Sequence, residues 1–207
     1  MGERLGTSNN ALFEYSVWLI PSRNSAYAEL RNAINKISYK YSTPSFEPHV
    51  TLIGRLLVPE ALAIEKISAI SNMVGQIKVE FDQIDRTDKY FKSLFIRVKK
   101  SDALSIAANI TREAFQEKHM SEYMPHLSLM YANMPSEMKD RIIHDCKLQA
   151  LVDSIDYVAM DKVSLWHTPD DVRRWKMIRE FELEKPVEEF SHYYKNELHS
   201  HYTAKTI

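Results

Sequence analysis

The chain has 207 residues, of which 44% are hydrophobic and 27% charged, and this is enough apolar material for one large domain or two closely joined lobes. Its formal net charge of −1 excludes the strongly basic character with which proteins bind long nucleic acids, although a small phosphorylated ligand remains compatible with it. With a single cysteine, Cys146, no intramolecular disulfide can form.

The composition also indicates where the chain works. A lone cysteine is typical of a reducing compartment, no apolar run approaches the roughly 20 residues of a transmembrane helix, and the first ten residues lack the apolar core of a signal peptide. We therefore expect a cytoplasmic monomer with no membrane contact. We also expect a flexible polar tail at residues 1–13, one folded domain at 14–184, and a C-terminal extension at 185–207.

The first half of the domain alternates strands and helices. An apolar stretch predicts a strand at 15–20, and periodic apolar residues predict a helix at 25–41. A second strand is expected at 46–53. Pro59 is a good first residue for the next helix, and alternation then predicts one half-buried strand at 77–84.

The second half repeats this order after a strand at 93–98. A helix is expected at 102–118, a strand at 123–131, and a helix from Pro135 to about Leu148. Two long strands, separated by a charged turn, close the domain at 155–166 and 174–184.

The two halves match at a constant offset in residue number, which is the offset from His49 to His126 (126 − 49 = 77). At this offset Thr51 falls on Ser128, and the strand segment SVWL at 16–19 falls on SLFI. Two copies are too few for a solenoid. The repeat therefore predicts a duplicated lobe with a pseudo-twofold axis.

Each copy carries a histidine and a hydroxyl two residues apart on a strand, in PHVTLIG and PHLSLMY. Side chains alternate along a strand, so both groups share one face. If the two strands are adjacent, two imidazoles and two hydroxyls meet in one cleft. Imidazoles on opposite sides of a phosphorus can deprotonate a water and protonate a leaving oxygen, and hydroxyls can donate to the non-bridging oxygens.

Other interpretations of these histidines are less well supported. One histidine on an apolar strand is commonly a hydrogen-bonded structural residue, but repetition at matched positions favours function. A metal site would need further ligands, and neither motif has the carboxylate or cysteine neighbours typical of zinc sites. We therefore expect no metal. Four glycines in the whole chain, without a glycine-rich motif, give no phosphate loop or dinucleotide fingerprint, so no cofactor is expected.

The paired HVTL and HLSL segments resemble the signature of the two-histidine (2H) phosphoesterase superfamily. YSVWLIP, FEPHVT, YMPHLSLMYA and LWHTPDDVRRWKMI are similar to its cyclic phosphodiesterase branch, known from plants and fungi. The resemblance covers about residues 14–184. It implies an α+β fold, a bilobal pseudo-twofold duplication in which two antiparallel sheets flank a central cleft, with helices outside. Plant relatives carry several cysteines, so a redox-controlled loop does not transfer to this chain.

The resemblance also implies a reaction. This is metal-independent hydrolysis of a small cyclic phosphate, either ribose 2′,3′-cyclic phosphate to the 2′-phosphate or ADP-ribose 1″,2″-cyclic phosphate to ADP-ribose 1″-phosphate. His49 and His126 are implied as the acid–base pair, Thr51 and Ser128 as phosphate-binding residues, and Tyr131 as a pocket residue. Two further aromatic residues match positions at the cleft mouth, where a nucleobase could stack: Trp18 and Phe91.

Two alternative functions remain. Other 2H branches act as phosphodiesterases or ligase-like enzymes on 2′-5′ or 3′-terminal RNA linkages, and a basic stripe of Lys92, Arg97, Lys99 and Lys100 could serve such a substrate. A nucleotide-binding module without catalysis is the second alternative. The histidines of the C-terminal extension, which could bind a metal adventitiously, are His192, His199 and His201.

Overall fold

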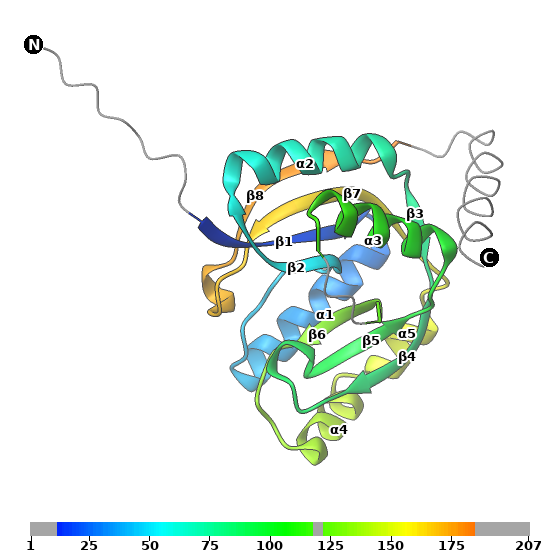
Figure 1. The fold of residues 1–207 in the computed structure, drawn as a ribbon. Helices are drawn as coiled ribbons and strands as arrows, with labels where there is room; N and C mark the ends of the chain where they lie inside the picture. The colour runs from blue at the N-terminus through cyan, green and yellow to red at the C-terminus, as the bar shows by residue number, and fades with distance from the viewer. Residues whose placement is uncertain (1–11, 118–121, 185–207) are drawn as a thin grey trace, which may run out of the picture.

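The structure is a computed structural model that describes residues 12–117 and 122–184 (Figure 1). Most of both predicted tails, with the three C-terminal histidines, therefore lies outside the described residues. The strands of the described part are β1 Leu12–Pro21, β2 Val50–Pro59, β3 Ile77–Val79, β4 Phe81–Arg86, β5 Leu94–Val98, β6 His126–Met130, β7 Val158–His167 and β8 Lys176–Glu182. The helices are α1 Ser25–Tyr41, α2 Glu60–Met73, α3 Asp102–Ala114, α4 Ser136–Asp145 and α5 Leu148–Asp153, with short 3₁₀ helices η1 Tyr90–Lys92 and η2 Val172–Arg174.

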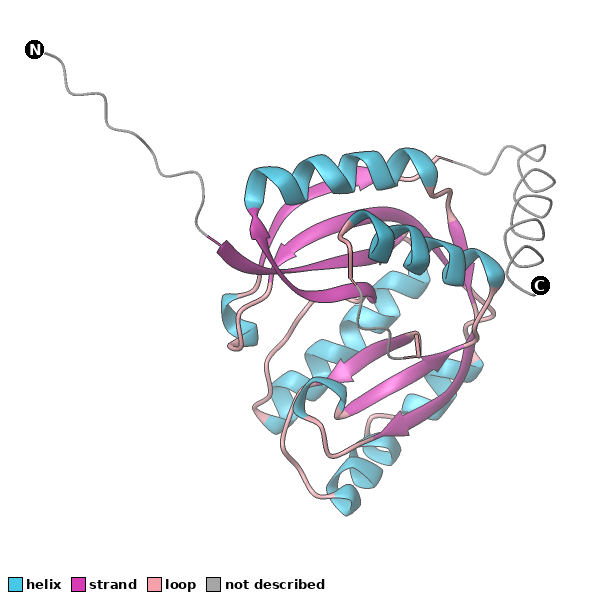
Figure 2. Ribbon diagram, in the orientation of Figure 1, coloured by secondary structure: helices cyan, strands magenta, loops and turns pink. Residues whose placement is uncertain are grey.

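The strands form one antiparallel sheet in the order β3-β7-β1-β2-β6-β5-β4, with β8 beside β7. Within residues 12–117 and 122–184, its two halves are joined only where β2 meets β6, through the residue pair Val50 and Leu127. Figures 1 and 2 show the sheet spreading apart on either side of this junction, with helices outside. The predicted α+β class with two flanking sheets is thus confirmed. The two flanking sheets are the two halves of a single continuous sheet.

The two lobes exchange helices. Helix α1 follows β1 in the sequence but packs on β6 of the other lobe, whereas α3 follows β5 but packs on β2 and α2. The buried face of α1 carries Leu30, Ile34 and Ile37. Each lobe therefore depends on a helix from the other half of the chain for its core.

The strand registers repeat the offset found in the sequence. In the first lobe Leu19 pairs with Val50 and Trp18 with Thr51. In the second lobe the equivalent residues make the same pairs, Ile96 with Leu127 and Phe95 with Ser128. The same backbone arrangement is therefore built twice, in agreement with a duplicated lobe.

Several predicted elements are wrong in their boundaries, among them the strand expected at 46–53, which is β2 at Val50–Pro59. The single strand expected at 77–84 is two strands, since β3 pairs with β7 in the first lobe and β4 with β5 in the second. Polarity alternates on both sides of Glu80, so the pattern does not reveal this change of partner. The helix expected to reach Leu148 ends at Asp145, and a left-handed Lys147 (φ 53°) separates it from α5.

None of the helices in the described part of the chain has the length and hydropathy that crossing a bilayer requires.

Candidate active site

The junction between the two lobes brings the four predicted polar residues together. Val50 and Leu127 are opposite each other and fully buried. Alternation places the neighbouring side chains on the other face, with His49 opposite Ser128 and Thr51 opposite His126. The two histidines and the two hydroxyls therefore occupy the diagonals of one four-residue cluster.

Both imidazoles are held in the same way. The Nδ1 atom of His49 lies 2.6 Å from the carbonyl oxygen of Glu47, and Nδ1 of His126 lies 3.0 Å from that of Met124. A carbonyl only accepts, so Nδ1 carries the proton in both rings and Nε2 of the neutral ring is left as a base. Glu47 and Met124 are also equivalent positions of the repeat, so the duplication includes the groups that orient the histidines.

Burial favours the neutral form of both rings. His49 is only 3% exposed, and its burial lowers its pKa to about 3, against the opposing effect of the Glu47 carbonyl and with a further lowering by His126. The pKa of His126 is also lowered by burial, the Met124 carbonyl opposes this, and the positive charge of Lys92 adds to it. Two neutral imidazoles are thus available as proton acceptors at neutral pH.

Trp18 does not lie at the cleft mouth, which corrects the prediction that a nucleobase stacks on it there. Its side chain is 1% exposed and lies between His49, which directly precedes β2, and Trp166 of β7, at centroid distances of 3.6 and 4.5 Å. Phe95, its equivalent in the second lobe, packs its ring against His126 at 5.2 Å. Each of the two aromatic rings therefore packs against one imidazole and helps to fix its orientation.

Tyr131, which the family resemblance implies as a pocket residue, lies beside Nε2 of His49. Its hydroxyl is 3.5 Å from Nε2 of His49. The residue is 3% exposed, and burial raises the pKa of its phenol above the usual range although Ser128 opposes this. The hydroxyl therefore stays protonated and can donate to the histidine.

Phe91, in η1, is 40% exposed, which is compatible with the predicted position at the mouth. Its ring is nearly parallel to that of Trp175 (13°, centroids 6.1 Å apart) and edge-on to Tyr131. Trp175 was not predicted as a site residue. Its ring centroid lies 6.3 Å from that of His49, and its indole N–H donates to the Pro169 carbonyl at 2.8 Å. In the sequence, the feature that could have indicated Trp175 is that it is the one aromatic residue within the charged run RRWK.

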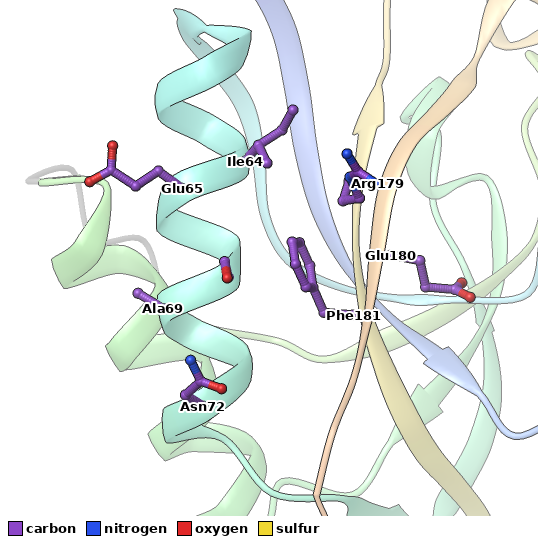
Figure 3. Close-up of a pocket in the computed structure, with 8 residues that line it drawn as sticks. Ile64, Glu65, Ala69, Asn72, Arg179, Glu180 and Phe181 are labelled. Carbon is purple, nitrogen blue, oxygen red and sulfur yellow. The ribbon is translucent and has the colours of Figure 1, made fainter.

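The described residues contain no group of three or more His, Cys, Asp or Glu side chains that could hold a metal ion. A separate groove of about 660 Å³ lies between α2 and β8 (Figure 3). It contains neither histidine. Its lining residues are Ile64, Glu65, Ser68, Ala69, Asn72, Arg179, Glu180 and Phe181.

Several known proteins are similar to this chain in sequence or in fold. The family of cyclic phosphodiesterase-like proteins matches residues 13–190. A cyclic phosphodiesterase of Arabidopsis thaliana is 23% identical over 60% of this chain and 68% of the relative, and a 2′,3′-cyclic-nucleotide 3′-phosphodiesterase of Phaeosphaeria nodorum is 28% identical over 58% and 70%. The crystal structure of E. coli LigT in apo form shares the fold, with a TM-score of 0.54 at 12% identity over 84% of this chain and 99% of that one. The chain therefore belongs to the family of cyclic phosphodiesterase-like proteins and is a phosphodiester hydrolase.

Proposed function

We propose that the protein hydrolyses a five-membered cyclic phosphodiester on a ribose, without a metal, by paired-histidine acid–base catalysis. The preferred reaction is ribose 2′,3′-cyclic phosphate to the 2′-phosphate, and the same chemistry would open ADP-ribose 1″,2″-cyclic phosphate to the 1″-phosphate. The observation that carries the proposal is the placement of two imidazoles, each with Nδ1 held by a carbonyl, diagonally opposite on one face with two hydroxyls.

In the proposed step, Nε2 of one histidine accepts a proton from water while the water oxygen attacks phosphorus. The bond from phosphorus to the ribose 3′ oxygen breaks, and Nε2–H of the other, protonated histidine gives its proton to that oxygen. Thr51 and Ser128 donate to the non-bridging oxygens as negative charge increases. The product is a 2′-phosphomonoester, and the two rings return to their starting states by exchange with solvent.

The step needs one proton on the pair, and the substrate itself favours this state. In the free protein burial lowers both pKa values, and a nearby positive charge lowers each further, that of His126 at His49 and that of Lys92 at His126. A cyclic phosphodiester carries one negative charge, which favours a protonated ring beside it. Substrate binding therefore raises the pKa of the pair, so that one imidazolium and one imidazole flank the phosphate.

The charges in the second lobe do not favour extended RNA as substrate. Three of the four cations in the predicted basic stripe are paired with carboxylates: Arg97 with Asp85, Lys99 with Glu80 at 3.0 Å, and Lys100 with Glu122 at 3.9 Å. Paired surface charges contribute little to binding of a polyanion. A small ligand suits this distribution better.

Turnover of adenosine 2′,3′-cyclic phosphate by the purified full chain tests the proposal. We expect conversion to adenosine 2′-phosphate, identified by phosphorus NMR, at the same rate with and without EDTA. Protein carrying both His49→Ala and His126→Ala, prepared in the same way, is the control. Binding without turnover would support the non-catalytic nucleotide-binding module instead, and loss of activity in EDTA that zinc or manganese restores would make the histidines metal ligands.

A further inference from the structure

Lys92 lies beside His126, at the C-terminal end of η1, and its side chain is half-buried. Its Nζ atom is 3.3 Å from the sulfur of Met124 and 5.3 Å from the centroid of the Phe95 ring. These are the two residues that also hold His126, because the Met124 carbonyl bonds Nδ1 and the Phe95 ring packs at 5.2 Å from the imidazole. A positive charge and a histidine of the proposed acid–base pair therefore share the same two neighbours.

The ammonium group of Lys92 is not neutralised by another side chain of the described residues. Its hydrogen-bond acceptor is a thioether sulfur, which is weak. Asp85 is the acidic group that acts on Lys92, but Asp85 is ion-paired with Arg97. Burial lowers the pKa of Lys92, the positive charges of Lys89 and Arg97 add to this, and Asp85 opposes it. An anion bound here would relieve both the desolvation and the repulsion.

This cation breaks the internal symmetry of the protein. The equivalent position in the first half is Tyr15, which is buried and donates its hydroxyl to Glu60 at 3.0 Å. Around His49 the neighbours are aromatic, with Trp18 and Trp175 packed against its ring. The two sides of a duplicated site thus differ in charge, and a substrate with unlike ends will bind in one direction.

We propose that Lys92 binds a second phosphate of the substrate, so that the preferred substrates are cyclic phosphodiesters that carry a further phosphate group. This inference rests on the proposed function. In the proposed step Thr51 and Ser128 already supply the donors for the scissile phosphate, which reacts at the Nε2 atoms. Lys92 contacts Met124, which holds the opposite, Nδ1 edge of His126. We therefore place its charge on the side of His126 away from Nε2, where a phosphate on another part of the same nucleotide can reach it.

The test compares two substrates that differ only in this group, adenosine 2′,3′-cyclic phosphate with and without a 5′-phosphate. We expect the wild-type chain to have a kcat/KM roughly tenfold higher for the 5′-phosphorylated compound, as for a hydrogen bond to a charged group. Lys92→Met, which keeps length and apolar contacts, should abolish this preference, and Lys92→Arg should retain it. Lys99→Met removes the same charge from an exposed position paired with Glu80, and should leave the preference unchanged.

Binding of the products gives a readout that does not need turnover. Calorimetry should show adenosine 2′,5′-bisphosphate binding about tenfold more tightly than adenosine 2′-phosphate to the wild type, and equally to Lys92→Met. Equal kcat/KM for both substrates in the wild type would overturn the inference and leave the proposed function standing. An equal loss on both substrates in Lys92→Met would also overturn it, because Lys92 would then act on the scissile phosphate. Hydrolysis of neither compound would instead overturn the proposed function.

Discussion

The ring of Trp18 stacks on the ring of His49, with centroids 3.6 Å apart and planes 8° from parallel. The second face of the indole is covered by Trp166, so the side chain has no surface left for a ligand. His49 is thereby fixed on three sides: by the indole, by the Glu47 carbonyl at Nδ1, and by the Tyr131 hydroxyl near Nε2. Trp18 is a positioning residue, and its replacement should affect rate more than affinity.

Trp18→Leu should lower kcat with little change in KM, because the imidazole loses the plane that orients it. A misplacement of about 1 Å costs on the order of 10²-fold in rate. Trp18→Phe keeps a flat partner and should retain much of the activity. Steady-state kinetics measures both, with circular dichroism to show that the variants are folded. A raised KM at unchanged kcat would show that Trp18 contacts the substrate after all.

Phe91→Ala should behave in the opposite way. The ring is 40% exposed and packs against the rings of Tyr90, Tyr131 and Trp175 rather than against a histidine, so its removal should raise KM and leave kcat nearly unchanged. Stacking of a base on an aromatic ring contributes roughly 1–3 kcal/mol. Phe91→Trp should restore affinity. Kinetics with a cyclic phosphate that lacks a base provides the control, since this substrate should not distinguish Phe91→Ala from the wild type.

The sequence was sufficient to predict which polar residues meet. Strand parity puts His49 with Thr51 and His126 with Ser128, and the offset of the repeat relates one pair to the other. Both signals can be recognised in the sequence without knowing how the lobes pack, although the two pairs meet only because the strands are adjacent. The structure adds that Val50 and Leu127 are the pair through which the two strands join.

Features that depend on distant packing could not be predicted in this way. Trp18 and Trp166 lie near opposite ends of the described chain, and only the pairing of β1 with β7 buries the first under the second. The isolation of Lys92 is equally hidden, because Arg97 and Lys99 look alike in the sequence until the carboxylates that pair with them are placed. Composition shows the charges of a chain, whereas only the fold shows which are neutralised.

Replacing either histidine of the pair should have a severe effect on rate. Each general acid or base contributes about 10²–10⁴-fold, so His49→Ala and His126→Ala should each lower kcat by that factor. The double variant should lose less than the two losses combined, because one histidine cannot complete the proton transfer alone. His144→Ala is the matched control, since that side chain is 91% exposed on α4. Additive losses in free energy would show that the two rings act independently.

The pH dependence should show where the pair titrates. The productive form carries one proton on two coupled rings, so the rate profile should be bell-shaped and report the pair as a unit. In the free protein both pKa values lie below the ordinary value of 6.5 for histidine. The singly protonated form is therefore most abundant below that pH, and kcat/KM, which reports the free protein, should reach its maximum on the acid side of 6.5.

Bound substrate should move this maximum upward. The negative phosphodiester favours a protonated imidazole, so the pKa values in the complex are higher, and the profile of kcat should lie at higher pH than that of kcat/KM. Lys92→Met supplies an internal check, because it removes one of the charges that lower the pKa of His126 and should shift the kcat/KM profile toward higher pH. Both shifts are tested by measuring kcat and kcat/KM across the acid and neutral pH range for the wild type and for Lys92→Met. Coincident profiles for kcat and kcat/KM would mean that the phosphate does not set the protonation of the pair, and that the proton for the leaving oxygen comes from another group.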